Sequence, residues 1–284
     1  MKKYLLILLL AIAASCAKTE QVGDSQLVVE GWIENGDHPV VLVSESIGIA
    51  TGKPVSSKEI LGHIAKWAKV TVSDGTTTET LTGVADSKYF PPYVFTTSKI
   101  TGEVGKEYTL TVEYKDYKAQ AVTRIPKPVP IDTVYVQSVS DTTASLRLGF
   151  TDPPQKGQYY KVFTKTEGID SHYHPSAMTN MSDESMNGYM EVFLYSTQRL
   201  MDSIDMPNIH LGDVMWIKLC TMEQNIFDYW NNFEMMLASN AFSTFYENDL
   251  TNNMDGAVGY WAGYGVAQEV KFKVELPESN GQTE

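Results

Sequence analysis

Side chains that could bind a soft metal ion are concentrated in the second half of this chain. Of the 12 methionines, only Met1 lies outside the segment from Met178 to Met254. The same region contains or adjoins three histidines and a cysteine: His172, His174, His210 and Cys220. Thioether, imidazole and thiolate ligands together suit Cu(I). The methionines form no repeated M-x-x-M pattern, however, and methionine is an adaptable core filler, so core packing is favoured and no metal or cofactor is predicted.

His172 and His174 flank a single tyrosine. In an extended segment, residues two apart point to the same side, so the two imidazoles would lie together. A zinc site would need further ligands, and the sequence identifies none. A polar surface loop is therefore the favoured interpretation, and the two histidines are kept as candidates for ligand binding.

Motifs of the common enzyme classes are missing from the sequence. It contains no G-x-S-x-G, H-E-x-x-H or P-loop pattern. A cysteine nucleophile requires a positioned base, and none is evident near Cys220. Asp183 and Glu184 are adjacent acids, but paired carboxylates hydrolyse glycosides only when they face each other across a cleft. We therefore predict a protein that is not an enzyme and name no catalytic residue.

The segment 252–265, NNMDGAVGYWAGYG, interleaves glycines with Tyr260, Trp261 and Tyr264. Glycine permits positive φ and close backbone approach, which favours a tight turn, plugged by aromatic rings, before a last strand at 270–276. The alternative is an exposed aromatic patch. If a binding surface exists, Tyr260, Trp261 and Tyr264, together with the two histidines, are its candidate residues.

One helix and one strand stand out among the elements that must position these residues. Residues 214–219, VMWIKL, are typical of a strand in a covered sheet. Thr221 and Gln224 form a capping-box pattern before a predicted helix over about 222–239. Apolar residues then recur on one helical face, which predicts that the helix covers a sheet: Met222, Ile226, Tyr229, Trp230, Phe233 and Leu237.

The remaining pattern predicts a mainly β protein built from two β-sandwich domains of immunoglobulin-like or transthyretin-like type. Short alternating strands at regular spacing are typical of sandwiches, and Asp74-Gly75 is a strong hairpin signal. Residues 125–131 contain three prolines, which predicts a stiff linker. The predicted domains are therefore 26–124 and 132–276, the second carrying the helix as an insertion, followed by a flexible tail at 277–284.

The N-terminus predicts export. Two lysines precede a short apolar run that ends in small residues and Cys16, a pattern typical of a signal peptide over 1–15 and similar to the lipobox of bacterial lipoproteins. That resemblance implies acylation of Cys16, a tether at 16–25 and, with Ala17 next, the outer membrane of a Gram-negative bacterium. A net charge of -13 argues against nucleic acid and against electrostatic docking on anionic lipid.

Four segments together resemble a family of Bacteroidetes lipoproteins of unknown function, whose genes often lie beside TonB-dependent receptors: LVVEGWIENGDHPVVLVSES, FTDPP at 150–154, SDESMNGY at 182–189 and NNMDGAVGYWAGYG. The N-terminal half is also similar to transthyretin-like and carboxypeptidase-regulatory-like domains. The resemblance implies a lipid-anchored accessory or ligand-binding component of a TonB-dependent uptake system, on the cell surface or the periplasmic face. The alternatives are a cell-surface adhesin or structural protein, and a surface hydrolase of glycans or peptides.

Overall fold

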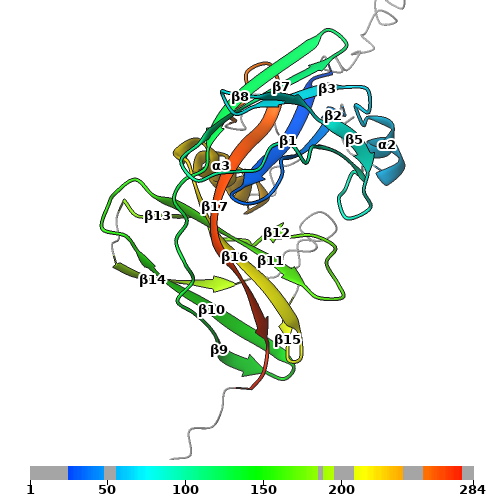
Figure 1. Ribbon diagram of the computed structural model, residues 1–284. Coiled ribbons are helices and arrows are strands. Elements are labelled where there is room, and N and C mark those ends of the chain that lie inside the picture. Colours follow the sequence, from blue (N-terminus) through cyan, green and yellow to red (C-terminus); the bar gives the residue numbers. More distant parts are fainter. Residues whose placement is uncertain (1–24, 48–55, 185–187, 195–207, 239–251, 277–284) are drawn as a thin grey trace, which may run out of the picture.

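The computed structural model describes residues 25–47, 56–184, 188–194, 208–238 and 252–276. These residues form three sheets and two helices, so the predicted mainly β fold is confirmed (Figure 1). No helix in this part of the chain is long and apolar enough to cross a membrane. The predicted signal peptide, lipidation site and tail, and almost all of the tether, lie outside the described ranges.

The largest sheet has nine strands, in the order β12-β11-β16-β17-β1-β2-β6-β5, with β13 paired to β11. Its strands are β1 (Leu27–Glu34), β2 (Val40–Glu45), β5 (Thr82–Ala85), β6 (Tyr93–Thr96), β11 (Tyr159–Thr166), β12 (His174–Pro175), β13 (Met181–Ser182), β16 (Val214–Met222) and β17 (Val258–Lys273). Most neighbours pair antiparallel, whereas β1 and β17 pair parallel.

Strand β17 belongs to both halves of the molecule. Its first part, Val258 to Tyr264, pairs with β1, and its second part, Gly265 to Lys273, pairs with β16. The large sheet therefore crosses the predicted boundary at 125–131. Residues 258–265 of the segment predicted as a turn before a strand at 270–276 already belong to β17, and they complete the N-terminal half.

A second sheet, in the order β4-β3-β7-β8, packs on the first part of the large sheet to make what we call the first sandwich. Its strands are β3 (Lys69–Ser73), β4 (Thr78–Thr80), β7 (Glu107–Tyr114) and β8 (Tyr117–Arg124). Inward-facing residues alternate along each strand, as expected for a sheet with one covered face. Trp261 of β17 is completely buried in this core and donates its indole N–H to the carbonyl of Tyr108, 2.9 Å away.

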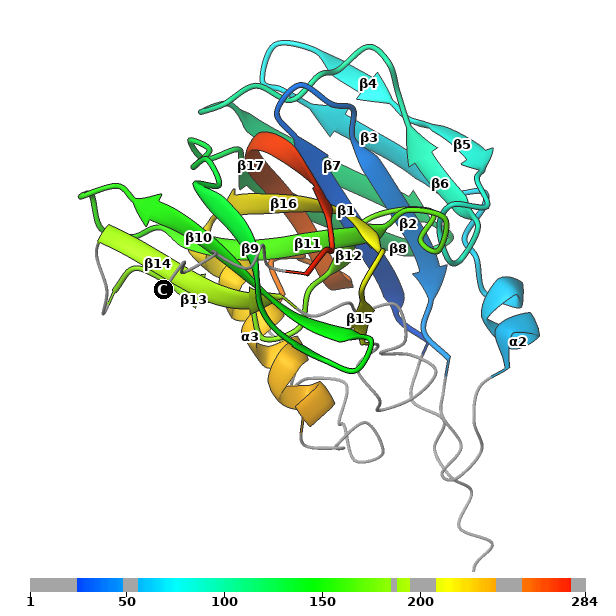
Figure 2. The ribbon, with the colours of Figure 1, turned by 90° about the horizontal axis from the view of Figure 1, so that it is seen from below.

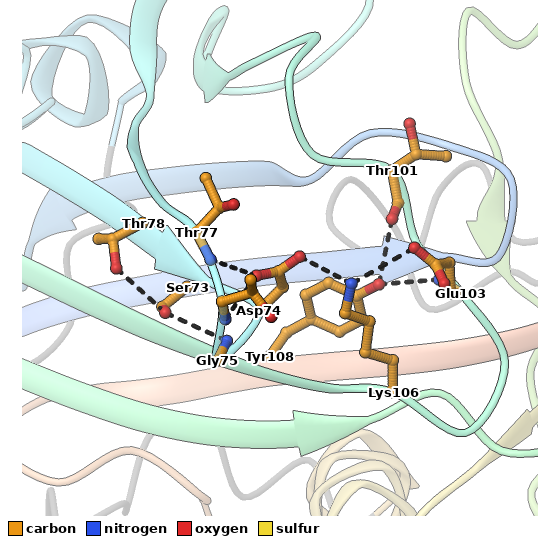
Figure 3. A network of polar contacts seen from close by, with 10 residues as sticks. Ser73, Asp74, Gly75, Thr77, Thr78, Thr101, Glu103, Lys106 and Tyr108 are labelled. Carbon is orange, nitrogen blue, oxygen red and sulfur yellow. Dashed lines mark hydrogen bonds and ion pairs between the residues drawn. The ribbon is translucent and has the colours of Figure 1, made fainter.

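The turn between β3 and β4 confirms the predicted hairpin. Gly75 has φ +83°, a conformation that suits glycine. The Asp74 carboxylate accepts from the backbone amides of Thr76 and Thr77 and from Lys106 Nζ, at 2.9, 2.7 and 2.7 Å (Figure 3). The Lys106 hydrogen bond, followed by the two amides, lowers the pKa of Asp74 to about 2.

A third sheet packs on β11, β16 and the second part of β17, and these layers form what we call the second sandwich. Its strands are β9 (Thr133–Ser140), β10 (Thr143–Asp152), β14 (Gly188–Leu194) and β15 (Ile209–His210), with β10 paired to the other three. The core between the layers is largely aliphatic, with Leu146, Leu148, Ile217 and Leu219 fully buried. Figure 2 shows this sandwich beside the first, joined through β17.

Helix α3 (Gln224–Ala238) covers the other face of the large sheet, as the periodicity predicted. The predicted apolar face is confirmed for Ile226, Tyr229, Trp230 and Phe233, which lie in or against a third core, whereas the side chain of Leu237 lies outside the described residues.

The predicted capping box is wrong, because β16 continues through Thr221 to Met222. Among the described residues, the Thr221 hydroxyl has no hydrogen-bond partner. Glu223 acts at the helix start instead, and its backbone carbonyl accepts from the amides of Ile226 and Phe227. The other described helix, α2 (Ser57–Gly62), begins after an N-cap at Ser56.

Candidate functional site

A group of polar and aromatic side chains, most of them half-buried, lies where the two sandwiches meet, on the face of the large sheet that carries α3. We call it the junction cluster and define it as Trp32, Glu34, Tyr89, His172, Tyr173, His174, Lys218 and Glu269. Strands β1, β16 and β17 supply Trp32, Glu34, Lys218 and Glu269. Tyr89 comes from the loop before β6, and the three consecutive residues 172–174 lead into β12. The cluster thus draws on both sandwiches.

Lys218 is the charged centre of the cluster. Its Nζ lies 2.8 Å from Glu34 Oε2 and 3.2 Å from Glu269 Oε1. The same ammonium lies 4.2 Å from the centroid of the Tyr173 ring, a geometry that favours a cation–π interaction. Burial is the largest single effect on the pKa of Lys218 and lowers it, but the charge and hydrogen bond of Glu34, together with Cys220 and Glu269, outweigh burial and raise the pKa above its usual value. The ammonium is therefore charged at neutral pH.

A row of rings extends from the large sheet to the histidines. The ring centroids of Trp32 and Tyr89 are 5.8 Å apart, those of Tyr89 and His172 are 5.1 Å apart, and those of His172 and His174 are 4.1 Å apart. Ser171 Oγ donates to the carbonyl of Lys88 at 2.7 Å, which joins the histidine segment to the Tyr89 loop. Contacts between side chains therefore connect two loops that are more than 80 residues apart.

The two histidines are neutral at pH 7. Burial and then the neighbouring His174 lower the pKa of His172 to about 4. Burial also lowers the pKa of His174, against the opposing effect of Asp170, whose Oδ1 lies 3.8 Å from His174 Nε2. The described residues contain no group of three or more His, Cys, Asp or Glu side chains that could hold a metal ion. The pair therefore offers neutral donors and acceptors rather than charge.

The aromatic residues of the glycine-rich segment are not exposed. Trp261 is 0% exposed, and Tyr260 and Tyr264 are nearly as buried. Tyr264 accepts from the indole N–H of Trp230 on α3 at 2.9 Å. These three residues therefore form no exposed patch. The structure does not bring them together with His172 and His174 on one surface.

The glycines of this segment do allow close backbone approach. Gly259 has φ +129°, and a Cβ there would lie 1.9 Å from the carbonyl oxygen of Val29. A Cβ at Gly263 would lie 2.4 Å from the carbonyl oxygen of Arg124. Side chains at either position would push β17 away from its neighbours, so the expectation of close approach is confirmed.

The other side chains considered for chemistry are dispersed. Cys220 is buried in the third core, and burial raises the pKa of its thiol. Met254 lies in the first core, Met215 in the second and Met222 in the third. Asp183 is buried and accepts from the amide of Gly157, whereas its neighbour in the sequence, Glu184, is exposed.

Most of the junction cluster was not anticipated. Lys218 is the one charged residue in the apolar run 214–219. Because lysine is rarely buried unless it is paired, this position alone indicates that Lys218 has an acidic partner. The period-2 alternation of β1 places Trp32 and Glu34 on one face. Tyr89 lies in a loop and carries no periodic signal.

Comparison with known proteins identifies the family. The family model "Domain of unknown function (DUF4249)" matches residues 17–269, so the chain belongs to that family, and the expected family of unknown function is confirmed to this extent. No curated protein matches the chain.

Solved structures match the chain at low similarity. A chain of a cytokine receptor complex has 8% identity and a TM-score of 0.26, covering 88% of this chain and 98% of its own. A two-domain fibronectin type-III segment from chicken tenascin has 8% identity and a TM-score of 0.22, covering 70% and 92%.

Proposed function

We propose that this protein is an outer-membrane lipoprotein, acylated at Cys16, that acts without catalysis as an accessory or ligand-binding component of a TonB-dependent uptake system. The junction cluster is its contact site. The support is one observation: half-buried rings and neutral imidazoles from both sandwiches meet around a lysine whose charge is already paired. The lipobox and the four family segments supply the membrane and uptake context.

The chemistry of the cluster favours binding over proton transfer. Glu34 and Glu269 both contact the same ammonium, which favours a role for both carboxylates within the cluster over proton transfer to a substrate. Trp32, Tyr89 and His172 present ring faces and polar edges, which give large contact area at low cost in conformational entropy. Because Trp32 and Lys218 stand on one continuous sheet, the contact site is held on rigid elements.

The test is affinity capture of the lipidated protein from native outer membranes in mild detergent. We expect the wild type to recover a TonB-dependent receptor in stoichiometric amount, and the double variant Tyr89→Ala/His172→Ala to recover much less. Tyr189→Ala is the matched control, because it removes an exposed aromatic ring on β14 of the second sandwich. Wild-type protein that comes out alone, even after crosslinking, would overturn the uptake proposal. Equal loss in the control would exclude the junction cluster as the contact site.

A further inference from the structure

One end of the first sandwich carries an unusually exposed tryptophan. Trp67, in the turn between α2 and β3, is 91% exposed, and Leu61 of α2 is 41% exposed. Exposure of an indole costs hydrophobic free energy, and nothing in the described residues covers it. We call this region the α2 end and define it by Ser25, α2, Trp67 and the β7–β8 turn at Lys115 and Asp116.

The start of the folded body is fixed to this same end. The Tyr117 hydroxyl, at the β7–β8 turn, donates to the carbonyl of Ser25, the first described residue. Glu45 pairs with Leu27 at the start of β1, and its amide donates to the carbonyl of His63 just after α2, at 2.9 Å. Figures 1 and 2 both show α2 lying beside the end of β2.

The charge of the α2 end differs from that of the whole chain. When the residue before Trp67 and the adjoining ends of β2, β3, β7 and β8 are counted with it, the lysines here are Lys58, Lys66, Lys69, Lys115 and Lys118, and the acids are Glu45, Glu59, Glu113 and Asp116. Five positive against four negative side chains make this end about neutral, while the chain carries -13. Two of the acids are held in ion pairs, Glu45 with Lys115 and Glu113 with Lys69. This end therefore avoids the repulsion from an anionic surface that the rest of the protein would meet.

We propose that Trp67 and Leu61 insert into the headgroup region of the membrane that holds the lipid anchor. The inference rests on the proposed acylation of Cys16. Residues 17–24 are all that separate Cys16 from Ser25, and a fully extended chain spans at most about 3.6 Å per residue, so the α2 end stays within roughly 30 Å of the bilayer. Tryptophan is enriched at the membrane–water interface, and lysine near the surface is attracted to anionic headgroups. The contact proposed for this end is therefore made through an interfacial ring and a near-neutral surface, and it does not require the electrostatic docking that the net charge of -13 disfavours.

The test uses the full lipidated protein in vesicles of phosphatidylethanolamine and phosphatidylglycerol whose acyl chains carry bromine. Bromine quenches indole emission at short range, so we expect the wild-type fluorescence to be partly quenched. Trp67→Phe should lose most of that quenching, and Trp216→Phe, which removes an indole from β16 in the second sandwich, should retain it. Both variants keep an aromatic ring. Because Trp67 is almost fully exposed, Trp67→Phe removes few packing contacts and should leave the fold intact.

The possible results distinguish failure of the Trp67 contact from failure of the lipid anchor at Cys16. Mass spectrometry of the N-terminal peptide reports acylation, and an unacylated Cys16 overturns the proposed function together with this inference. If the protein is acylated but the wild type and Trp67→Phe are quenched equally, the anchor is present and Trp67 does not contact the lipid. That result overturns this inference and leaves the proposed function standing. Quenching that disappears when outer-membrane proteins are included would identify the α2 end as a protein-docking surface and refute the lipid contact.

Discussion

Lys218 of β16 and Glu34 of β1 form an ion pair across the strand that separates them. Their charged atoms are 2.8 Å apart, although the residues are 184 positions apart in the chain. Strand β17 lies between β16 and β1 in the sheet, so the pair spans it. The two side chains are 9% and 16% exposed, which places the pair largely away from water.

The Lys218→Met variant should be strongly destabilised, because it leaves Glu34 buried without its ammonium. Breaking a buried pair from one side costs about 3–5 kcal/mol. The double variant Lys218→Met/Glu34→Gln should recover a large part of that loss, since no unpaired charge remains at Glu34. Urea unfolding of the three proteins measures both effects.

Lys271→Met is the matched control for this pair. Lys271 of β17 forms an exposed ion pair with Glu167, which follows β11, and exposed pairs contribute about 0–1 kcal/mol. A Lys218→Met protein as stable as Lys271→Met would show that the pair across β17 is not structural.

Gly31→Ala should destabilise the first sandwich through a clash with Trp261. An added Cβ would lie 2.9 Å from Cε3 of that indole, and overpacking of a core costs about 1–3 kcal/mol. In a Trp261→Leu background, which is itself destabilised, the same Gly31→Ala change should cost clearly less. Thermal and urea unfolding of the four proteins give the coupling free energy.

Gly62→Ala serves as the control for that cycle, because a Cβ there meets no atom within 4 Å. It should be neutral or slightly stabilising. If Gly31→Ala costs the same with and without the indole, the glycine is required for some reason other than the approach of Trp261.

Acidification should weaken the junction cluster through His172. Its pKa in the folded protein is about 4, below the ordinary value of 6.5, so the unfolded chain binds a proton first. The stabilising contribution is therefore complete above pH 6.5 and is lost as the pH falls toward 4. We expect the urea concentration at the unfolding midpoint to decrease when the pH is lowered from 7 to 5. The decrease should be smaller in His172→Gln.

His174 contributes to the same slope, because its pKa is also lowered, so the slope in His172→Gln is reduced but not abolished. His210→Gln changes a half-exposed imidazole and controls for the loss of any histidine. An unchanged slope in His172→Gln would contradict the burial of a neutral imidazole in the cluster.

The sequence was sufficient where the determining signal is local. The apolar face of α3 follows from the spacing of its apolar residues alone. The turn at Asp74-Gly75 follows from the need for a positive φ at one backbone position, which glycine adopts readily. The start of α3 was misplaced, because Thr221 has the chemistry of a cap but its neighbours Cys220 and Met222 are buried strand residues. Burial of a strand, which depends on tertiary packing, overrode the local motif.

The sequence does not predict which strands pair when they lie far apart in the chain. Gly259 and Gly263 indicate that another backbone comes close, but nothing near them specifies that the backbones belong to Val29 and Arg124. For the same reason the candidate site was recovered only in part. His172 and His174 are recognisable by spacing, whereas Trp32 and Lys218 join them only once β17 has aligned β1 with β16.

The central position of β17 also determines when the protein can become native during its synthesis. Strand β1 is made early, yet its parallel partner begins at Val258, near the end of translation. Until then the nascent chain lacks Trp261 in its first core and exposes one edge of β1, and an open strand edge is a template for aggregation. Pairing of such distant segments is intrinsically slow. The growing polypeptide therefore cannot finish its N-terminal half first, and a chain terminated before residue 252 should depend on chaperones to remain soluble.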